Sequence, residues 1–373
     1  MATLDGFGRP ADVPWWVGLV LLPLLNLLAA FVIAGGVIWV LGVDPVAALK
    51  VLVWGAFGDT DLIGFTLYYT TNFIFAGLAV AIAFHCGLFN IGGEGQAYIA
   101  GLGVGLVGLA MGGWPWPVVM AVAVISAALF GGIWALVPAW LQAYRGSHIV
   151  ITTIMFNFIA ASIMNYVMVD VLIAPGQQAP ESRAFDPSTH LPSLQDLLAL
   201  FGIRSRTSFL NVSFLLAVAC CVAFWVFVWH TRWGYGIRTV GQNERAAVYA
   251  GIRPGRMIML AMVISGALAG LVAVNVLLGA QHRIILNYTG GVGFVGIAVA
   301  LMGRNHPLGI FLSALLFGAL YQGGSELNFE FPKLSTEMVV VIQGLIILFA
   351  GALENLFRPQ VEALFRRRLR AAA

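Results

Sequence analysis

Phe89-Asn-Ile-Gly-Gly-Glu-Gly-Gln96 interrupts an apolar region with three glycines, one acid and two amides. A lipid-facing helix does not tolerate this composition, because non-helical backbone survives at membrane depth only where protein or a water-filled cavity satisfies its polar groups. A carboxylate at the centre of a span costs about 2.5 to 3.5 kcal/mol. We therefore expect Glu94 to face inward or to lie near the interface, where it either bonds backbone N–H groups and holds the break closed or contacts a solute.

The composition around this break is that of a membrane protein. Of the 373 residues, 60% are hydrophobic and only 9% are charged, and the mean hydropathy is +0.93. A water-soluble globule is excluded, because too little polar surface is present to cover it. The sequence predicts an all-α polytopic membrane protein with one membrane domain, 15–353, between an N-terminal segment, 1–14, and a basic tail, 354–373. Ten spans are predicted, at about 15–41, 62–84, 93–111, 116–144, 149–173, 209–230, 257–279, 290–303, 307–322 and 337–353.

Further polar interruptions lie later in the chain. Gly290-Gly-Val-Gly-Phe294 is a second break, and Gly303-Arg-Asn-His-Pro-Leu-Gly309 is a third, in which Pro307 ends one helix and can open the next. Broken or re-entrant helices are therefore expected. Candidates for a translocation path are the polar residues at the first break and within two later spans: Asn90, Glu94, Gln96, Asn157 and Asn275. Each could instead make an interhelical hydrogen bond, worth about 1 kcal/mol.

The distribution of positive charge predicts the orientation. An even number of spans puts both termini on one side, and with cytoplasmic termini only six of the 19 Lys and Arg residues fall on the opposite side: Lys50, Arg183, Arg204, Arg206, Arg283 and Lys333. The remaining 13 are cytoplasmic, as the positive-inside rule requires. This orientation places the 231–256 segment in the cytoplasm and the polar insert, 175–208, outside. The tail is expected to contact anionic membrane lipid.

The 231–256 segment has the pattern of a docking element. Asn243 is suited to cap a short helix, Glu244 to its positive N-terminal end, and Gly251 to close it before Pro254. Alanines at 246, 247 and 250 favour helix and give it a small-residue face. A capped helix of about two turns over 243–250 is typical of an element that another protein grips, although a solvated connector explains the same pattern.

Motifs for ATP hydrolysis and for catalysis are missing from the sequence. The two lysines, Lys50 and Lys333, lie outside any Walker A pattern, and the six histidines show no metal-site spacing. Ion-coupled transporters commonly place acids within spans, and Glu94 is the only acid in the predicted span cores. We expect no enzyme activity, metal or cofactor in this chain and an energy source outside it. An ion-coupled secondary transporter of a small polar solute and a membrane enzyme remain the alternatives.

Several stretches spread along the chain carry a family resemblance: Gly77-Leu-Ala-Val-Ala81 with Gly87–Gln96, Val150-Ile-Thr-Thr-Ile-Met-Phe-Asn157, Arg238-Thr-Val-Gly-Gln-Asn243 with Ala246-Ala247 and Ala250-Gly-Ile252, and Gly293–Gly309. In these stretches the chain resembles the permease subunits of bacterial ABC importers for simple sugars and nucleosides, which belong to the branched-chain amino acid and ribose permease group. One departure is that Ser147-His-Ile-Val150 stands where the family has Asn-Glu-Val, so that His148 replaces an acid.

The resemblance implies a fold, a location and partners. The fold is that of the vitamin B12 permease type (type II), in the bacterial cytoplasmic (inner) membrane. The partners are an ATPase subunit that binds ATP and Mg, a second permease subunit in a heterodimer, and a periplasmic binding protein that delivers a nucleoside or simple sugar. No nucleic acid is expected. The 175–208 insert is a plausible landing surface for the binding protein.

The resemblance also implies residues at the ATPase. The 243–250 helix is hypothesised to dock into a groove of that subunit, with coupling residues Arg238, Gly241, Asn243, Glu244, Ala246, Ala247 and Gly251. A cytoplasmic turn, Arg304, Asn305 and His306, either contacts the ATPase or caps helix ends.

Overall fold

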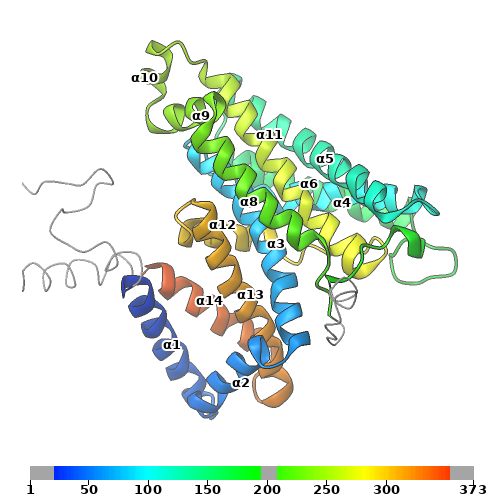
Figure 1. Cartoon of the computed structure of the whole chain (residues 1–373), viewed down its shortest axis with the longest axis vertical. Coiled ribbons are helices and arrows are strands. Elements are labelled where there is room, and N and C mark those ends of the chain that lie inside the picture. Colours follow the sequence, from blue (N-terminus) through cyan, green and yellow to red (C-terminus); the bar gives the residue numbers. More distant parts are fainter. Residues whose placement is uncertain (1–20, 195–207, 353–373) are drawn as a thin grey trace, which may run out of the picture. The chain divides into compact units, whose positions relative to one another are not determined.

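A computed structural model describes residues 21–194 and 208–352 of the chain (Figure 1). The predicted terminal segment 1–14, the basic tail 354–373 and part of the 175–208 insert lie outside the described residues. Two compact units divide the chain: unit 1 comprises Met1–Gly55 and Leu320–Ala373, and unit 2 comprises Ala56–Ala319.

Helices make up almost all of the regular structure, which confirms the all-α class. The described residues contain no named strand, only the isolated bridges Glu181–Ile285 and Ser193–Asn211. Two helices end in π-helical turns: α6 continues through Val167–Val171 and α11 through Val274–Gln281. The helices are α1 (Leu22–Val40), α2 (Pro45–Phe57), α3 (Thr60–His85), α4 (Gly93–Ala110), α5 (Trp116–Arg145), α6 (Ile149–Tyr166), α8 (Ser213–His230), α9 (Arg232–Gln242), α10 (Glu244–Tyr249), α11 (Pro254–Ala273), α12 (Val292–Met302), α13 (Pro307–Glu330) and α14 (Thr336–Ala352).

The predicted number of ten spans is not confirmed. Within the described residues, six segments are long and apolar enough to cross a membrane, and a seventh is reached if a bent pair is counted as one span. The six are Thr60–His85, Trp116–Arg145, Ile149–Val171, Ser213–His230, Pro254–Gln281 and Pro307–Glu330.

Two predicted spans differ from the structure for physical reasons. The described part of the first, 15–41, is α1, which ends at Val40 as predicted, but a further helix that was not predicted, α2, follows after a bend of 119°. Asp44 supports this new helix start by accepting a hydrogen bond from the Val46 N–H at 2.9 Å. The predicted span 290–303 is α12, and its 11 residues extend only about 16 Å at 1.5 Å per residue, roughly half of a bilayer core.

Unit 2 is built around α3, α5 and α11. Most of α3 is buried, including Phe73, Ile74 and Leu78, whereas most of α6 and α8 is not. Helices α5 and α11 touch through their backbones, because a methyl group on Gly131 would collide with the carbonyl oxygen of Gly266. Small residues of this kind let membrane helices approach closely.

Unit 2 has two opposite ends, because α5 has 30 residues and spans about 45 Å. At the α10 end, the ring of Tyr144 near the end of α5 lies against Gly255 at the start of α11. At the other end, the Gly113 N–H before α5 donates to the Ser188 hydroxyl of the insert at 2.8 Å. We call this second end the insert end.

The described part of the insert is fixed to the chain that follows α11. The backbone N–H groups of Ser182, Phe185 and Leu191 donate to carbonyl oxygens of Ile284, His282 and Leu278, at 3.0, 2.8 and 3.0 Å. Arg283 also forms an ion pair with Glu181 at 2.8 Å. The rings of His190 and His282 stack, with centroids 3.7 Å apart. The insert is therefore a packed part of unit 2 at this end.

We expect this attachment to weaken in acid. Burial lowers the pKa of His282, just beyond the span that ends at Gln281, and the neighbouring His190 lowers it further, while a backbone hydrogen bond opposes both. Arg283, adjacent to His282, is paired with Glu181, and Asp186 interacts electrostatically with His190. Because protonation of His282 favours the detached insert, stability is lost as the pH falls below the unfolded value of about 6.5.

Hydrogen-exchange protection factors of the Phe185 and Leu191 amides measure this effect. They should fall between about pH 7.5 and pH 5.5. The control is His282→Asn, since asparagine accepts the left-handed backbone of this position, φ 54°, and cannot titrate. Protection factors that stay level in the unchanged protein would contradict the prediction.

Candidate functional site

The two glycine-rich breaks meet at the side chain of Glu94. This residue lies in the first turn of α4, and its carboxylate accepts hydrogen bonds from the backbone N–H groups of Gly291 and Gly293, at 2.9 and 2.7 Å. The hydroxyl of Thr289 donates to the same carboxylate. Because α12 begins at Val292, the negative charge lies at the positive end of that helix. Glu94, in the first break (89–96), thus caps α12 by accepting hydrogen bonds from N–H groups of the second break (290–294).

Amide side chains satisfy the irregular backbone of the first break. Asn157 on α6 accepts from the Gly95 N–H at 2.9 Å and donates to the Ile91 carbonyl at 3.0 Å. Within the break, Asn90 accepts from the Gly92 N–H at 2.8 Å. These bonds are what non-helical backbone needs at membrane depth.

The other predicted pathway residues are buried and bonded to neighbouring helices. Asn90 donates to Gln96 at 3.0 Å and to the Ser265 hydroxyl of α11 at 2.8 Å. Asn275 accepts from Asn211 and Ser213 and donates to Asn72 and to the Tyr68 carbonyl. All five candidates therefore make hydrogen bonds within the protein in this structure, the alternative role that the sequence left open.

Sequence reasoning missed the partners of these residues. The partners Ser265, Thr289, Asn211 and Asn72 lie in or beside apolar runs, and nothing in their local pattern pairs them with the predicted pathway residues. The one usable signal was at Thr289, which directly precedes the glycines of the second break.

The short helix predicted over 243–250 is present as α10, at one end of unit 2 (Figure 1). Asn243 accepts from the Ala246 N–H at 3.0 Å, and Gly251, with φ 77°, ends the helix as expected. Two of the three alanines predicted to form its small-residue face, Ala246 and Ala250, are exposed, and the third is not. Ala247 is fully buried, so its methyl group is not available to a partner, whereas Tyr249 is 94% exposed and Val248 is 58% exposed. Glu244 and Ala246 are also exposed.

Helix α9 joins α10 to the first break through a backbone contact. Gly241 lies in its last turn, and a Cβ there would collide with the His85 carbonyl and lie 2.8 Å from the Gly87 nitrogen. Gly87 itself has φ 74°, in the turn between α3 and the break. Only glycine fits this approach, which brings α9 against the end of α3. Arg238, one turn earlier on α9, is half-buried.

The predicted turn 304–306 meets the same end of α3. The His85 Nε2 donates to the Asn305 carbonyl at 3.0 Å, and the rings of His306 and Trp229 lie 5.2 Å apart. Arg304 and Asn305 have left-handed backbone, with φ of 52° and 54°. The end of α3 is therefore where α9, the first break and the α12–α13 turn come together. Over the residues that the structure describes, no group of three or more His, Cys, Asp or Glu side chains could hold a metal ion.

Glu94→Gln should destabilise the chain by about 1 to 3 kcal/mol, because a neutral amide is a weaker acceptor and leaves a buried N–H poorly bonded. Thermal unfolding of the purified chain in detergent measures the loss. The matched control is Glu181→Gln, which removes a half-exposed ion pair and should cost about 1 kcal/mol or less. Equal losses in the two variants would contradict the capping role.

Comparison with known proteins identifies the family. Residues 62–351 match the family described as branched-chain amino acid transport system / permease component. The chain is 34% identical to the guanosine ABC transporter permease protein NupP of Bacillus subtilis (strain 168), over 89% of this chain and 93% of NupP. It is 32% identical to the glucose ABC transporter permease protein TsgB13 of Haloferax volcanii, over 93% of this chain and 90% of that protein.

A third relative, the nucleoside ABC transporter permease protein NupB of Lactococcus lactis subsp. cremoris, is 30% identical over 88% of this chain and 90% of NupB. No solved structure shows a significant match. The match covers both breaks and the α9–α10 segment, so it includes the contacts described above. The chain therefore belongs to this family of permease components and is an ABC transporter permease.

Proposed function

We propose that the chain forms one half of the membrane pathway of an ABC importer for a nucleoside or a simple sugar. The observation that carries the proposal is similarity over about nine-tenths of the chain to guanosine, glucose and nucleoside permeases. A periplasmic binding protein delivers the substrate, and a separate ATPase subunit binds ATP and Mg. The transporter lies in the cytoplasmic membrane with both termini of this chain inside.

The other half of the pathway is a second, related permease. Bacillus subtilis and Lactococcus lactis each have a further permease, NupQ and NupC, that matches only 68% of this chain at 28% and 26% identity. Two unequal relatives in one organism support a heterodimer in which this chain is the longer partner.

The α10 end faces the ATPase and the insert end faces the binding protein. The positive charges of α9, α10 and the start of α11, such as Arg245, Arg253 and Arg256, favour a cytoplasmic position for this end. On α10 itself, Val248 and Tyr249 are the exposed large apolar and aromatic side chains, and aromatic residues are enriched among those that dominate protein interfaces.

Movement of the ATPase reaches the pathway through the end of α3. Helix α10 follows α9 after one extended residue, Asn243, and Gly241 of α9 contacts the His85–Gly87 turn with no side chain between the two backbones. This turn leads into the first break, where Glu94 caps α12. A shift of α10 therefore acts on the starts of α4 and α12 at once, as expected for a transition between discrete packed states.

Reconstitution tests the function directly. The chain, a second permease and the ATPase are placed in vesicles with a binding protein, and uptake of labelled guanosine and glucose is measured. We expect uptake of one of the two classes that requires ATP and all subunits. Uptake by this chain alone, driven by a proton or sodium gradient, would support an ion-coupled transporter and contradict the proposal.

Tyr249→Ala tests the docking surface. Loss of a central interface aromatic typically costs about 2 kcal/mol or more, so binding of the ATPase should weaken about 30-fold. The control is Tyr235→Ala, which removes a tyrosine that is 57% exposed on α9 and outside α10. Binding measured on the detergent-purified permease pair should be weakened by the first change only, and equal effects would count against α10 as the docking element.

A further inference from the structure

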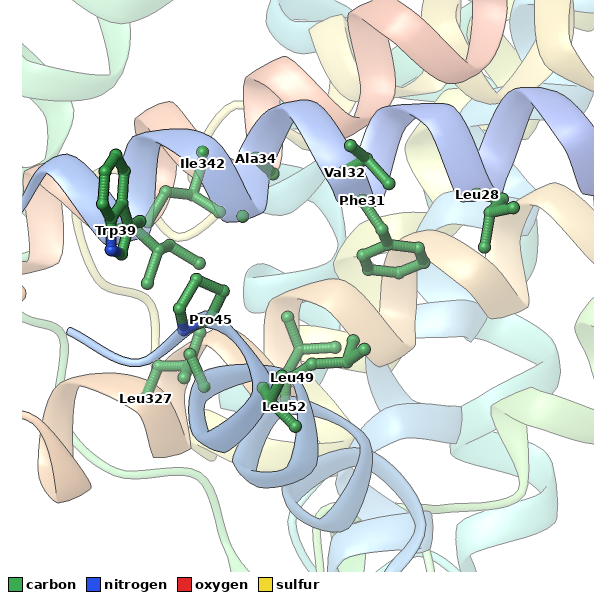
Figure 2. A pocket seen from close by; sticks show the side chains of 15 residues that line it. Leu28, Phe31, Val32, Ala34, Trp39, Pro45, Leu49, Leu52, Leu327 and Ile342 are labelled. Atoms are coloured by element: carbon green, nitrogen blue, oxygen red, sulfur yellow. The ribbon is translucent and has the colours of Figure 1, made fainter.

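A long apolar groove runs along unit 1, between α1, α2, the end of α13 and α14. It has a volume of about 420 Å³, and all of its lining residues are apolar or glycine. Figure 2 shows side chains of α1, such as Phe31 and Leu28, on one side and those of α2, such as Leu49 and Leu52, on the other. The 119° bend between α1 and α2 gives the groove its two walls.

The groove is open to the surroundings. Leu28, Val32 and Trp39 line it and are 63%, 68% and 73% exposed. Its only polar side-chain atom is the indole nitrogen of Trp39, so it offers almost no hydrogen bonds. A nucleoside or sugar would lose the bonds of several hydroxyl groups on entering it, which excludes the transported substrate as its occupant.

The space between the walls of the groove is too narrow to enclose a whole helix. The lining residues of α1 run from Leu28 to Trp39, which is about 16 Å at 1.5 Å per residue. A volume of about 420 Å³ over that length gives a mean cross-section of about 26 Å², whereas a helix about 10 Å across occupies about 80 Å². The space suits a single extended hydrocarbon chain.

We propose that this groove binds one acyl chain of a membrane lipid. A hydrocarbon chain needs no hydrogen bonds and gains contact with both apolar walls. The amphipathic ring of Trp39, at the end where α1 turns into α2, is typical of residues at the level of the headgroups. The lipid bound here is an ordered component of unit 1, distinct from lipid that exchanges over the exposed faces of α6 and α8.

Filling the groove tests the proposal. Gly36 lines it, and a Cβ there meets no atom within 4 Å, so the position is open to the larger side chain of Gly36→Leu. The matched control is Gly344→Leu on α14, which also meets nothing within 4 Å and lies outside the groove lining. Gly36→Ala is a milder variant for use if the leucine prevents folding, since alanine favours helix.

The full chain is reconstituted in phosphatidylcholine vesicles with a phospholipid that carries a photoreactive acyl chain. Labelling around Phe158, which is exposed on α6, gives the level expected for surface lipid. We expect the peptide 28–52 to be labelled above this level in the unchanged chain and in Gly344→Leu, and only at this level in Gly36→Leu. Equal labelling in all three would overturn the proposal, as it indicates surface lipid only. Labelling that disappears when a second permease is added would also overturn it, because a protein then covers the groove.

Discussion

The hydrogen bonds that Glu94 accepts at the start of α12 are the constraint on which the rest of unit 2 depends. Helices that stop within a bilayer leave N–H groups that no water can satisfy. One carboxylate on α4 satisfies two such groups and a hydroxyl on the second break. The amides of Asn157 and Asn90 do the same for the first break and tie it to α6 and α11. Two interrupted helices are thereby held as one packed element.

Features set by local chemistry could be predicted from the sequence. The membrane class follows from composition, and the cap at Asn243 and the stop at Gly251 follow from residues within one turn of each other. The interruption at 89–96 was visible because its polar residues are adjacent. Its contact with the second break could not be predicted, since Thr289 is 195 positions from Glu94 and no local pattern links the two residues.

Features set by packing could not be predicted in this way. Apolar length shows that a segment can cross a bilayer but not that the chain bends at Leu41–Asp44 or that α12 stops at half length. Ala246, Ala247 and Ala250 suggested a small-residue face on α10, yet Ala247 is buried whereas the other two alanines and Tyr249 are exposed. The rotation of a six-residue helix is decided by α9 and α11 beside it, which sequence periodicity does not report.

The fastening of the insert to residues 278–285 has a consequence for the opposite face of the membrane. The chain that leaves this attachment continues directly to Asn287, whose N–H donates to the Tyr98 hydroxyl, and then to Thr289 and Gly291 at Glu94. In the proposed orientation, a protein that bound the insert from outside would act on the start of α12, and an ATPase that bound α10 would act on the turn before α4. Both effects would then meet at the Glu94 carboxylate, so the two proposed docking events would be coupled.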